Sequence, residues 1–491
     1  MSAVPVAKGR ESAHSTGEKG PDLEPVRYSH RLEHLGYRVA CALVRTVRHE
    51  HSATLGAIAG RLAWTLLRRR RQTTIENLEK TLVEVPEELR RRLARRSFET
   101  LGCFLFEQVS AARFEPKELE RRFDVVGAEH LAAATAAGRG VLLLTGHFGP
   151  FDLAAYPVRS HVAKLHLVYR PASNPLVDGE LRAIRERTGA ILLPRQRVAQ
   201  RMFLALRHGE VVAAAIDQRV NPLAGSTLVD FLGRPAWATS VPALLHQRTG
   251  AAVVPLFTYP AGRGRYRLEI DPPVSAESLG DDPEAELTRR YFEPLERRIR
   301  RDPELWMWLH ERWQIVFRHR DPRYRERLAR ESGLAELPQL EANESPVVLD
   351  LDREARVVLE QPFLESCRNV QLCGPSEVVL RAARDLVAAA LQQGWAARAE
   401  HAPALADRLR AGESKGRLGA ELRELDRRAL VWIEGLDDVV NEDARRLLAR
   451  QLERRSGRGS IVLDTNARGQ RGDALDAALE RAASNALPLR L

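Results

Sequence analysis

The sequence predicts an α/β protein with a mixed, largely buried sheet and a second, smaller α/β domain. Three observations lead to this fold class. Short apolar runs typical of buried strands alternate with helix-like segments from residue 141 onward. Apolar residues make up 44% of the 491 positions, which is enough for the cores of two or three domains. A polar stretch separates two such alternating regions.

The domain boundaries follow from composition. Residues 1–30 are polar and rich in Gly, Ser, Pro and charges, so we expect a disordered tail and no secretory signal peptide. The first domain extends over 31–330, the polar stretch at 331–346 is the expected linker, and the second α/β domain covers 347–491.

Two helices are expected after the tail, at Leu32–Val47 and Ser52–Leu67. The second is small and apolar and ends in four arginines, Arg68 to Arg71. Neither segment reaches the roughly 18 uninterrupted apolar residues that a spanning helix needs. The pattern favours membrane-associated helices that lie on an anionic bilayer, with the arginines at the headgroups. The alternative is a helical hairpin packed against the domain.

The remaining elements of the first domain alternate along the chain. Residues 73–125 are highly charged and indicate helices. The expected strands are Val141–Leu144, Lys164–Tyr169, Ile191–Leu193, Val211–Ile216, Ala252–Phe257 and Tyr266–Ile270. The expected helices are Leu181–Thr188, Val198–Arg207 and Ser240–Thr249.

The first of these strands leads into the segment with the most chemistry. His147 follows the strand directly, at the carboxyl end where open α/β sheets bind ligands. Pro150 is expected at the first position of a helix and Asp152 in its first turn. The H-x4-D spacing alone is weak, because a chain of this length contains about one by chance. In its strand–turn–helix context it predicts a dyad, with Asp152 orienting the imidazole and His147 accepting a proton.

The charge balance indicates an anionic partner. Lys and Arg number 76 against 66 Asp and Glu, giving a net charge of +10. Phospholipid headgroups, lipid phosphates, an acidic carrier protein and nucleic acid all fit, and the alternative is a solvated basic surface. The four cysteines lack metal-ligand spacing, so we expect neither a disulfide framework nor a metal site, and a reducing compartment suits them. They are Cys41, Cys103, Cys367 and Cys373.

Further motifs follow the histidine in a fixed order. They are Val168-Tyr-Arg-Pro171, Asn174-Pro175, Arg187-x-Gly189, Leu193-Pro-Arg195, Ile216-Asp-Gln218, Phe231-Leu-Gly-Arg-Pro-Ala236 with Thr239, and Trp306-x-Trp308-x-His310-x-Arg312-Trp313. With His147-Phe-Gly-Pro-Phe-Asp152, this succession resembles the lipid A late acyltransferase branch of the lysophospholipid acyltransferase superfamily. Matches in the same order over residues 30–325 are more specific than any one motif.

The resemblance implies an acyltransferase that needs no cofactor. A fatty acyl chain would pass from an acyl thioester, on acyl carrier protein or CoA, to a hydroxyl of a lipid A precursor or related glycolipid. His147 would be the general base with Asp152 beside it, and no covalent serine or cysteine intermediate is required. Six residues are expected to bind substrate: Arg170, Asp217, Gln218, Arg234, His310 and Arg312.

The resemblance also implies a location and partners. The family works at the cytoplasmic face of the inner membrane, so we expect a peripheral or monotopic protein. The expected partners are membrane lipids, acyl carrier protein and the glycolipid acceptor, and nucleic acid is not among them.

Each substrate-binding residue has a structural alternative. Arg170 and Arg234 suit lipid phosphates, because guanidinium pairs bidentately with phosphate, but surface ion pairs explain them equally. Asp217 and Gln218 end a strand, where they support a neighbouring catalytic residue, contact substrate or cap a turn. The aromatic cluster at 306–313 is typical of a core.

Two departures from the family pattern leave the acceptor open. Leu305 replaces a common Gln, and Pro150 stands where the family has Asn, a change that affects substrate choice more than chemistry. The glycerophosphate branch usually adds an F-P-E-G-[ST]-R block, whereas Ile216-Asp-Gln-Arg219 stands here. The lipid A-like branch is therefore favoured. Acyl transfer to a glycerophospholipid or a phosphatidylinositol mannoside, and an inactive membrane scaffold, remain alternatives.

The second domain carries an eroded nucleotide-binding pattern. Gly374-Pro-Ser376 opens a helix after a strand, and Walker B-like and sensor-like strands follow, so the domain resembles a P-loop ATPase of the AAA type. A working P-loop needs G-x4-G-K-[ST], but Val379, Leu380 and Arg381 occupy the last three places. We expect a degenerate, non-hydrolytic module for regulation or for a protein partner; the alternative is an unrelated α/β domain. The expected strands are Val347–Leu349, Val370–Leu372, Leu430–Ile433 and Ile461–Leu463.

Overall fold

A computed structural model describes most of the chain. It covers residues 27–194, 197–222, 225–315, 328, 330–332, 369–373, 376–393, 395–434, 436–439, 441–455, 459–464, 474–484 and 486–490. The predictions for residues 1–26, for the linker after Ser332 and for the strand at Val347–Leu349 lie outside these residues.

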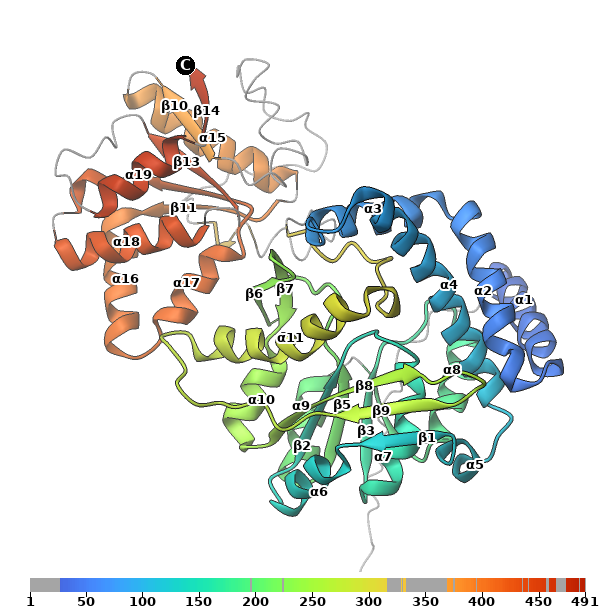
Figure 1. The fold of residues 1–491 in the computed structure, drawn as a ribbon. Coiled ribbons are helices and arrows are strands. Elements are labelled where there is room, and N and C mark those ends of the chain that lie inside the picture. The colour runs from blue at the N-terminus through green and yellow to red at the C-terminus, as the bar shows by residue number, and fades with distance from the viewer. Residues whose placement is uncertain are drawn as a thin grey trace, which may run out of the picture.

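The N-terminal region is a layer of helices at one edge of the molecule (Figure 1). Its members are α1 (Tyr28–Thr46), α2 (His49–Leu66), α3 (Arg68–Thr81), α4 (Glu87–Ala111) and α5 (Pro116–Glu120). The helices predicted here are confirmed, although α1 begins inside the segment predicted as tail. Among the described residues, no helix combines the length and the hydropathy that crossing a membrane requires.

Glycines bring α2 and α4 into close contact. A Cβ on Gly56 would lie 2.3 Å from the carbonyl oxygen of Gly102, and a Cβ on Gly60 would lie 2.2 Å from that of Phe98. Only a hydrogen at these positions lets the two backbones approach this closely, as in small-xxx-small helix pairs.

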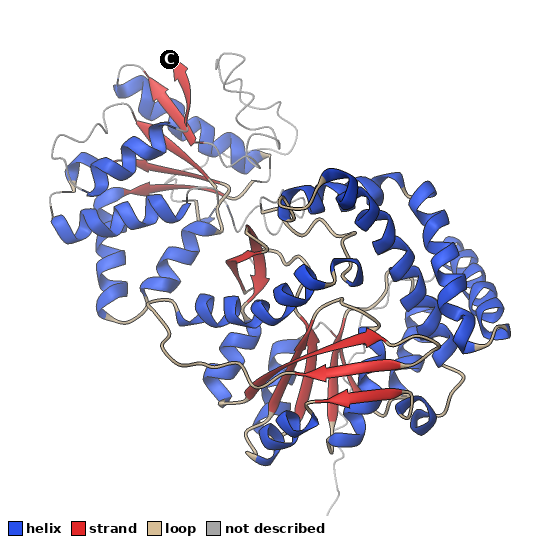
Figure 2. Ribbon diagram, in the orientation of Figure 1, coloured by secondary structure: helices blue, strands red, loops and turns tan. Residues whose placement is uncertain are grey.

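The core of the first domain is a seven-stranded mixed sheet in the order β1-β9-β8-β2-β5-β3-β4 (Figure 2). β8 pairs antiparallel with β9, and the other neighbours pair in parallel. The strands are β1 (Phe123–Val126), β2 (Val141–Thr145), β3 (Leu165–Tyr169), β4 (Ile191–Pro194), β5 (Val211–Ala215), β8 (Ala252–Pro260) and β9 (Tyr266–Ile270). The helices are α6 (Ala128–Ala136), η1 (Phe151–Ala154), α7 (Ala155–His161), α8 (Pro175–Glu186), α9 (Val198–Arg207), α10 (Val241–Thr249), α11 (Pro283–Arg301) and η2 (Pro303–Leu305).

Both faces of this sheet are buried, as the continuous apolar run of β2 predicts. Leu142 and Leu144 pack into a cluster with residues of α9, α10 and α11. Val141 and Leu143 point the other way, into a cluster with residues of α6 and α7. Alternate side chains of β2 therefore pack on opposite faces of the sheet, and the strand lies between two layers of helices.

The six predicted strands and three predicted helices of this domain are confirmed, with shifts at their ends. The strand β1 lies within the segment predicted to be helical, so that prediction was wrong at its end. A hairpin of β6 (Ser226–Phe231) and β7 (Arg234–Thr239) was missed. Its two-residue turn, Leu232-Gly233, has positive φ at both positions, as a type I′ turn requires.

The second domain is a parallel five-stranded sheet in the order β11-β12-β13-β10-β14. Three of its predicted strands are confirmed, as β10, β12 and β13, while β11 and β14 were missed. The strands are β10 (Asn369–Cys373), β11 (Ala397–His401), β12 (Leu430–Glu434), β13 (Ser460–Asp464) and β14 (Ala486–Arg490). The helices are α15 (Ser376–Gln392), α16 (Ala402–Ser414), α17 (Leu418–Asp426), η3 (Leu436–Asp438), α18 (Glu442–Arg455) and α19 (Ala474–Ser484).

Candidate active site

His147 lies on a tight loop directly after β2. Gly149 in this loop has a φ of +60° and passes the backbone of β8 so closely that a Cβ would lie 1.8 Å from the carbonyl oxygen of Thr258. Glycine is required there for both reasons. The helix predicted after the loop begins as a 3-10 turn, η1, and continues directly into α7; Pro150 lies just before η1, and Asp152 lies in its first turn.

The imidazole of His147 is held by Asp217, at the end of the neighbouring strand. Nδ1 of His147 donates to Oδ1 of Asp217 over 2.7 Å. Oδ2 of the same carboxylate accepts from the backbone N–H of His147 and from Nε1 of Trp306, each over 2.7 Å. Because an ionised carboxylate only accepts hydrogen bonds, Nδ1 carries a proton, so in the neutral form of the ring the lone pair is on Nε2.

The register of the sheet explains this pairing. β2 and β5 are parallel neighbours, and Thr145 stands opposite Ala215. Two residues further along each strand come His147 and Asp217. Equivalent positions beyond the carboxyl ends of two paired strands must lie side by side, so the sheet itself forms the pair.

Electrostatics favour the charged form of both partners. Burial by itself would lower the pKa of His147, but the charge of Asp217 and its hydrogen bond raise that pKa above its usual value. Burial would raise the pKa of Asp217, but His147 and the hydrogen bonds from its ring, its backbone and Trp306 lower that pKa to about 2. The Asp217 carboxylate is therefore ionised at neutral pH, and it stabilises an imidazolium beside it.

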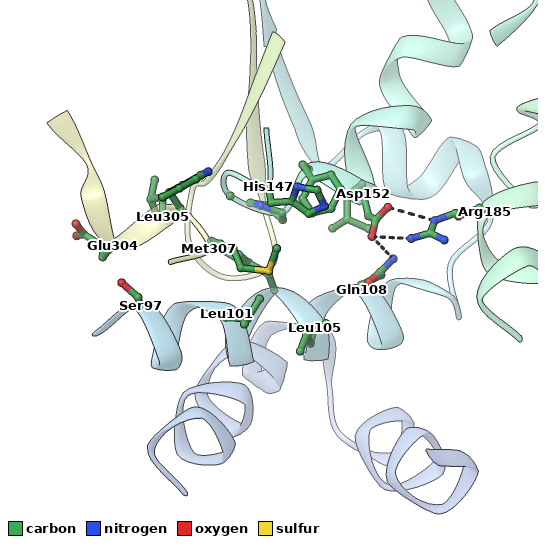
Figure 3. Close-up of a pocket in the computed structure, with 16 residues that line it drawn as sticks. Ser97, Leu101, Leu105, Gln108, His147, Asp152, Arg185, Glu304, Leu305 and Met307 are labelled. Atoms are coloured by element: carbon green, nitrogen blue, oxygen red, sulfur yellow. Dashed lines mark hydrogen bonds and ion pairs between the residues drawn. The ribbon is translucent and has the colours of Figure 1, made fainter. Parts of the chain in front are cut away.

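Asp152 does not take the orienting position that the sequence predicted for it. Its carboxylate accepts from Gln108 over 2.9 Å and from Nε and a terminal nitrogen of Arg185 over 3.3 Å each. The side chain points from η1 toward α4 and α8 rather than toward Nδ1 of His147 (Figure 3). Asp152 still raises the pKa of His147 through its charge. Both residues also line the two cavities that meet at this point of the fold.

The far side of the imidazole faces Gln218 and His310. The side-chain nitrogen of Gln218 lies 2.9 Å from Nε2 of His147 and 3.5 Å from Nε2 of His310. The rings of His147 and His310 are 6.3 Å apart between centroids. Burial, followed by the charge of His147, lowers the pKa of His310. A neutral His310 therefore stands beside a His147 that is able to charge.

The three predicted arginines have three different positions. Arg170 is exposed and lines the larger cavity described below. Arg234 lies outside both cavities and donates to the carbonyl of Lys80 on α3. Arg312 is fully buried, with its guanidinium packed 5.2 Å from the ring of Phe231, and burial lowers its pKa to about 10. The expectation that Arg234 and Arg312 bind substrate finds no support in this geometry.

Two cavities meet at His147. The smaller, of about 230 Å³, lies above α4 and is lined mainly by apolar side chains such as Leu101, Leu105, Leu305 and Met307 (Figure 3). The larger, of about 560 Å³, extends between β2, β3, β5 and α7. Apolar residues of β2, β3, β5 and α7 line much of it, and its polar lining residues lie at or beyond the strand ends: Tyr169, Arg170, Gln218, Arg219 and His310.

Sequence reasoning named most of the groups around His147 but missed some of their roles. Asp217 was expected to support a catalytic residue, to contact substrate or to cap a turn, and its role as the carboxylate that holds Nδ1 of His147 was not named. Its place two residues beyond a strand paired with β2 was the available signal. Gln108 and Arg185, which hold Asp152, lie on helices and carry no motif. In the described part of the chain, no three His, Cys, Asp or Glu side chains gather as a metal site would require.

The fold and site define a class: an α/β protein with a buried histidine–carboxylate pair at the meeting point of two cavities, one of them mainly apolar. Comparison with known proteins identifies the group. Residues 27–315 match the family described as "Bacterial lipid A biosynthesis acyltransferase". The chain belongs to this family.

Individual relatives agree. The chain is 32% identical to the lipid A biosynthesis lauroyltransferase of Escherichia coli K12 over 263 residues, which cover 53% of this chain and 84% of the relative. It is 28% identical to a lipid A biosynthesis acyltransferase of Haemophilus influenzae over 236 residues, or 48% and 72% of the two chains. It is also 28% identical to a phosphatidylinositol mannoside acyltransferase of Mycobacterium tuberculosis over 250 residues, or 46% and 77%.

Proposed function

We propose that this protein transfers a fatty acyl chain from an acyl thioester to a hydroxyl of a lipid A precursor, with His147 as general base. The observation that carries the proposal is the placement of the imidazole, which a carboxylate holds on one side and which borders two cavities. Asp217 holds Nδ1 over 2.7 Å and leaves Nε2 at the junction of two cavities. The relatives named for lipid A acylation support the acceptor class.

The reaction uses the lone pair of Nε2, which accepts from the side-chain N–H of Gln218 in this structure and from the acceptor hydroxyl in the reaction. The acceptor hydroxyl gives its proton to Nε2 as its oxygen attacks the thioester carbonyl. The tetrahedral intermediate collapses, the C–S bond breaks, and the thiolate takes the proton from the imidazolium. An ester and a free thiol result. Asp217 acts through His147 as a positioning residue that stabilises the transient imidazolium.

The two cavities suit two lipid substrates. The larger combines apolar lining residues with Arg170 and Arg219 beyond the strand ends, which suits an acyl chain together with a phosphate group. The smaller includes Leu105, which is also 53% exposed at the surface of the helical layer. We assign the thioester's acyl chain to the larger cavity and a chain of the glycolipid acceptor to the smaller. The donor is acyl carrier protein or CoA, and no cofactor takes part.

A bilayer is the proposed partner of the N-terminal helices. Exposed apolar side chains recur on α1 at helical spacing: Tyr28, Leu32, Leu35, Val39 and Leu43. A second row on α2 consists of Ile58, Leu62 and Leu66, and the arginines at 68–71 follow directly. Apolar rows with adjacent arginines suit an anionic lipid surface. We place the protein on the cytoplasmic face of the inner membrane, as a peripheral or monotopic enzyme.

The second domain is proposed to be a P-loop-type module that does not bind nucleotide. β10 lies inside the sheet, between β13 and β14, and leads into α15 as the strand before a P-loop does. Val379, at the place of the second P-loop glycine, is fully buried in the core of this domain. The lysine and hydroxyl that grip phosphate and magnesium are replaced by Leu380 and Arg381. Titration with a fluorescent ATP analogue and Mg²⁺ tests this: no binding is expected, and micromolar affinity would contradict it.

The decisive experiment is acyl transfer by the full chain in detergent. The donor is acyl carrier protein loaded with a fatty acid, and three acceptors are compared: a tetraacylated lipid A precursor with its sugar extension, a phosphatidylinositol mannoside, and lysophosphatidate. We expect transfer to the lipid A precursor and its loss in His147→Ala. Transfer only to the mannoside, the acceptor named for one relative, or only to lysophosphatidate would reassign the acceptor. Membrane binding without transfer to any of them would support a scaffold.

A further inference from the structure

The segment 306–315 connects the candidate active site to the second domain. It begins at Trp306, which donates to Asp217 and forms a β-bridge with Phe148. Its next residue, Met307, donates its backbone N–H to the carbonyl of His147 over 3.1 Å. His310 faces Gln218, as described above. The segment is neither helix nor strand, so its contacts with other elements must hold its conformation.

The other end of this segment contacts the second domain. The side chain of Ile315 packs against the apolar core of that domain, which contains Val370, Leu386 and Trp395. The carbonyl of Ile315 accepts from Nε1 of Trp237, on β7, over 2.7 Å. Ile315 lies five positions after His310, and such a stretch spans less than about 18 Å even when fully extended. A short piece of chain therefore connects the second domain to His310, and Asn77 of α3 also holds this piece through the carbonyls of Trp308 and His310.

The chain beyond this segment is tied to the second domain as well. Leu328 is buried in the same apolar core. Glu331 pairs with the fully buried Arg428 over 2.9 Å, and the carbonyl of Ser332 accepts from the backbone N–H of Ala399 over 2.7 Å. The predicted linker thus begins inside the packing of the second domain.

A charged face holds the second domain against the first. Asp281, Asp282 and Glu284 lie at the start of α11, and arginines of α17 and α18 meet them. Arg423 pairs with Asp282 and, over 2.9 Å, with Glu284. The side chains of these three residues are only 10–15% exposed, so the pairs are largely shielded from solvent.

Two further contacts complete this face. Arg450 pairs with Asp281 over 2.9 Å. Gly419 packs so closely that a Cβ would lie 2.6 Å from the side chain of Asp282. Figure 1 shows α17 beside the start of α11 and the β6–β7 hairpin.

We propose that the second domain is a clamp: its docking on α11 through Arg423 and Gly419 holds segment 306–315 in place and so keeps Trp306 and His310 at the catalytic imidazole. A P-loop-type domain without its phosphate grip retains a rigid sheet, and here that sheet supports a neighbouring active site. The partner of the α17–α18 surface is the acyltransferase domain of the same chain. As far as activity is concerned, the proposal rests on the function proposed above.

Gly419 offers a selective test in the full-length protein. Gly419→Leu inserts a side chain where even a Cβ is too close to Asp282, and leucine favours the helix that contains it. Ala420→Leu is the matched control, because the neighbouring Ala420 is exposed on the same helix. The first readout is hydrogen–deuterium exchange, which needs no substrate.

In Gly419→Leu we expect the amides of 305–315 and of Gly149, which donates to the carbonyl of Leu305, to exchange at least about tenfold faster. The amides of β2, β5 and β12 should be unchanged, and Ala420→Leu should match the wild type. The kcat for acyl transfer should fall at least about tenfold in Gly419→Leu alone.

A second variant tests loss of docking without inserting a bulky side chain between the two domains. Arg423→Glu places like charges against Asp282 and Glu284, and adding Glu284→Arg restores one opposite pair. We expect the double variant to recover protection of 305–315 and most of the lost kcat.

The clamp is overturned if α17 and the start of α11 lose protection while 305–315 keep theirs, or if neither variant opens the docking face. If the wild type transfers no acyl group, the proposed function fails, but the exchange result still decides the clamp.

Discussion

The carboxylate that matters most for the histidine is predicted to be Asp217 and not Asp152. Replacing Asp217 with Asn removes a charge that accepts three hydrogen bonds, from Nδ1 and the backbone of His147 and from Trp306. An asparagine has one acceptor oxygen, and its NH₂ group opposes the remaining donors, so the imidazole loses both its tautomer and its counter-charge. The equivalent change in a Ser–His–Asp triad lowers kcat by about 10⁴.

We expect Asp217→Asn to lower kcat by about 10³–10⁴, equivalent to roughly 4–5.5 kcal/mol of transition-state stabilisation. Asp152→Asn should cost about tenfold or less, because it breaks a partly exposed pair with Arg185 and keeps an oxygen that Gln108 can reach. Comparing these two variants therefore tells whether Asp152, which the sequence motif indicates, or Asp217, which the structure places beside the imidazole, supports His147.

The assay is steady-state acyl transfer, with circular dichroism and thermal unfolding to show that both variants fold. In the pH profile of Asp217→Asn, the residual activity should fall off at a lower pH than in the wild type, because the charge that raises the pKa of His147 is gone. Equal losses in the two variants, or a larger loss in Asp152→Asn, would refute the reasoning.

Four further outcomes follow. In the wild type, kcat should rise with pH through the pKa of His147, which lies above its usual value because of Asp217, since only the neutral imidazole accepts a proton; an acid limb centred below about 6.5 would contradict this. Gly149→Ala should lower kcat by about a hundredfold and reduce the melting temperature, whereas Gly179→Ala, which has open space for its Cβ, should do neither. Gly60→Leu should force α2 away from α4 and destabilise the protein by about 1–3 kcal/mol in denaturant unfolding. Leu66→Glu, at a side chain 76% exposed, should weaken binding to anionic vesicles in a flotation assay by at least about tenfold, and unchanged binding would place the membrane surface elsewhere.

Local patterns were sufficient for much of the fold. Short apolar runs marked β2, β3, β4, β5, β8 and β9, because a buried strand has few other compositions available. The hairpin β6–β7 was missed because Pro235 argues against a strand and because its turn depends on a positive φ at Leu232, which is uncommon outside glycine. β1 lay hidden in a charged segment whose helical character ended a few residues earlier.

The sequence by itself determined the class of this protein, since an ordered set of motifs around His147 is a local property of the chain. It also determined that His147 lies at a strand end, because the apolar run and the glycines allow little else there. Only the tertiary structure decided which carboxylate holds the imidazole: parallel pairing of β2 and β5 brings Asp217 to His147 across 70 positions, while Asp152, five positions away, turns toward Arg185. Sequence spacing measures separation along the chain, whereas a hydrogen bond depends on separation in space, and the register of a sheet sets that distance.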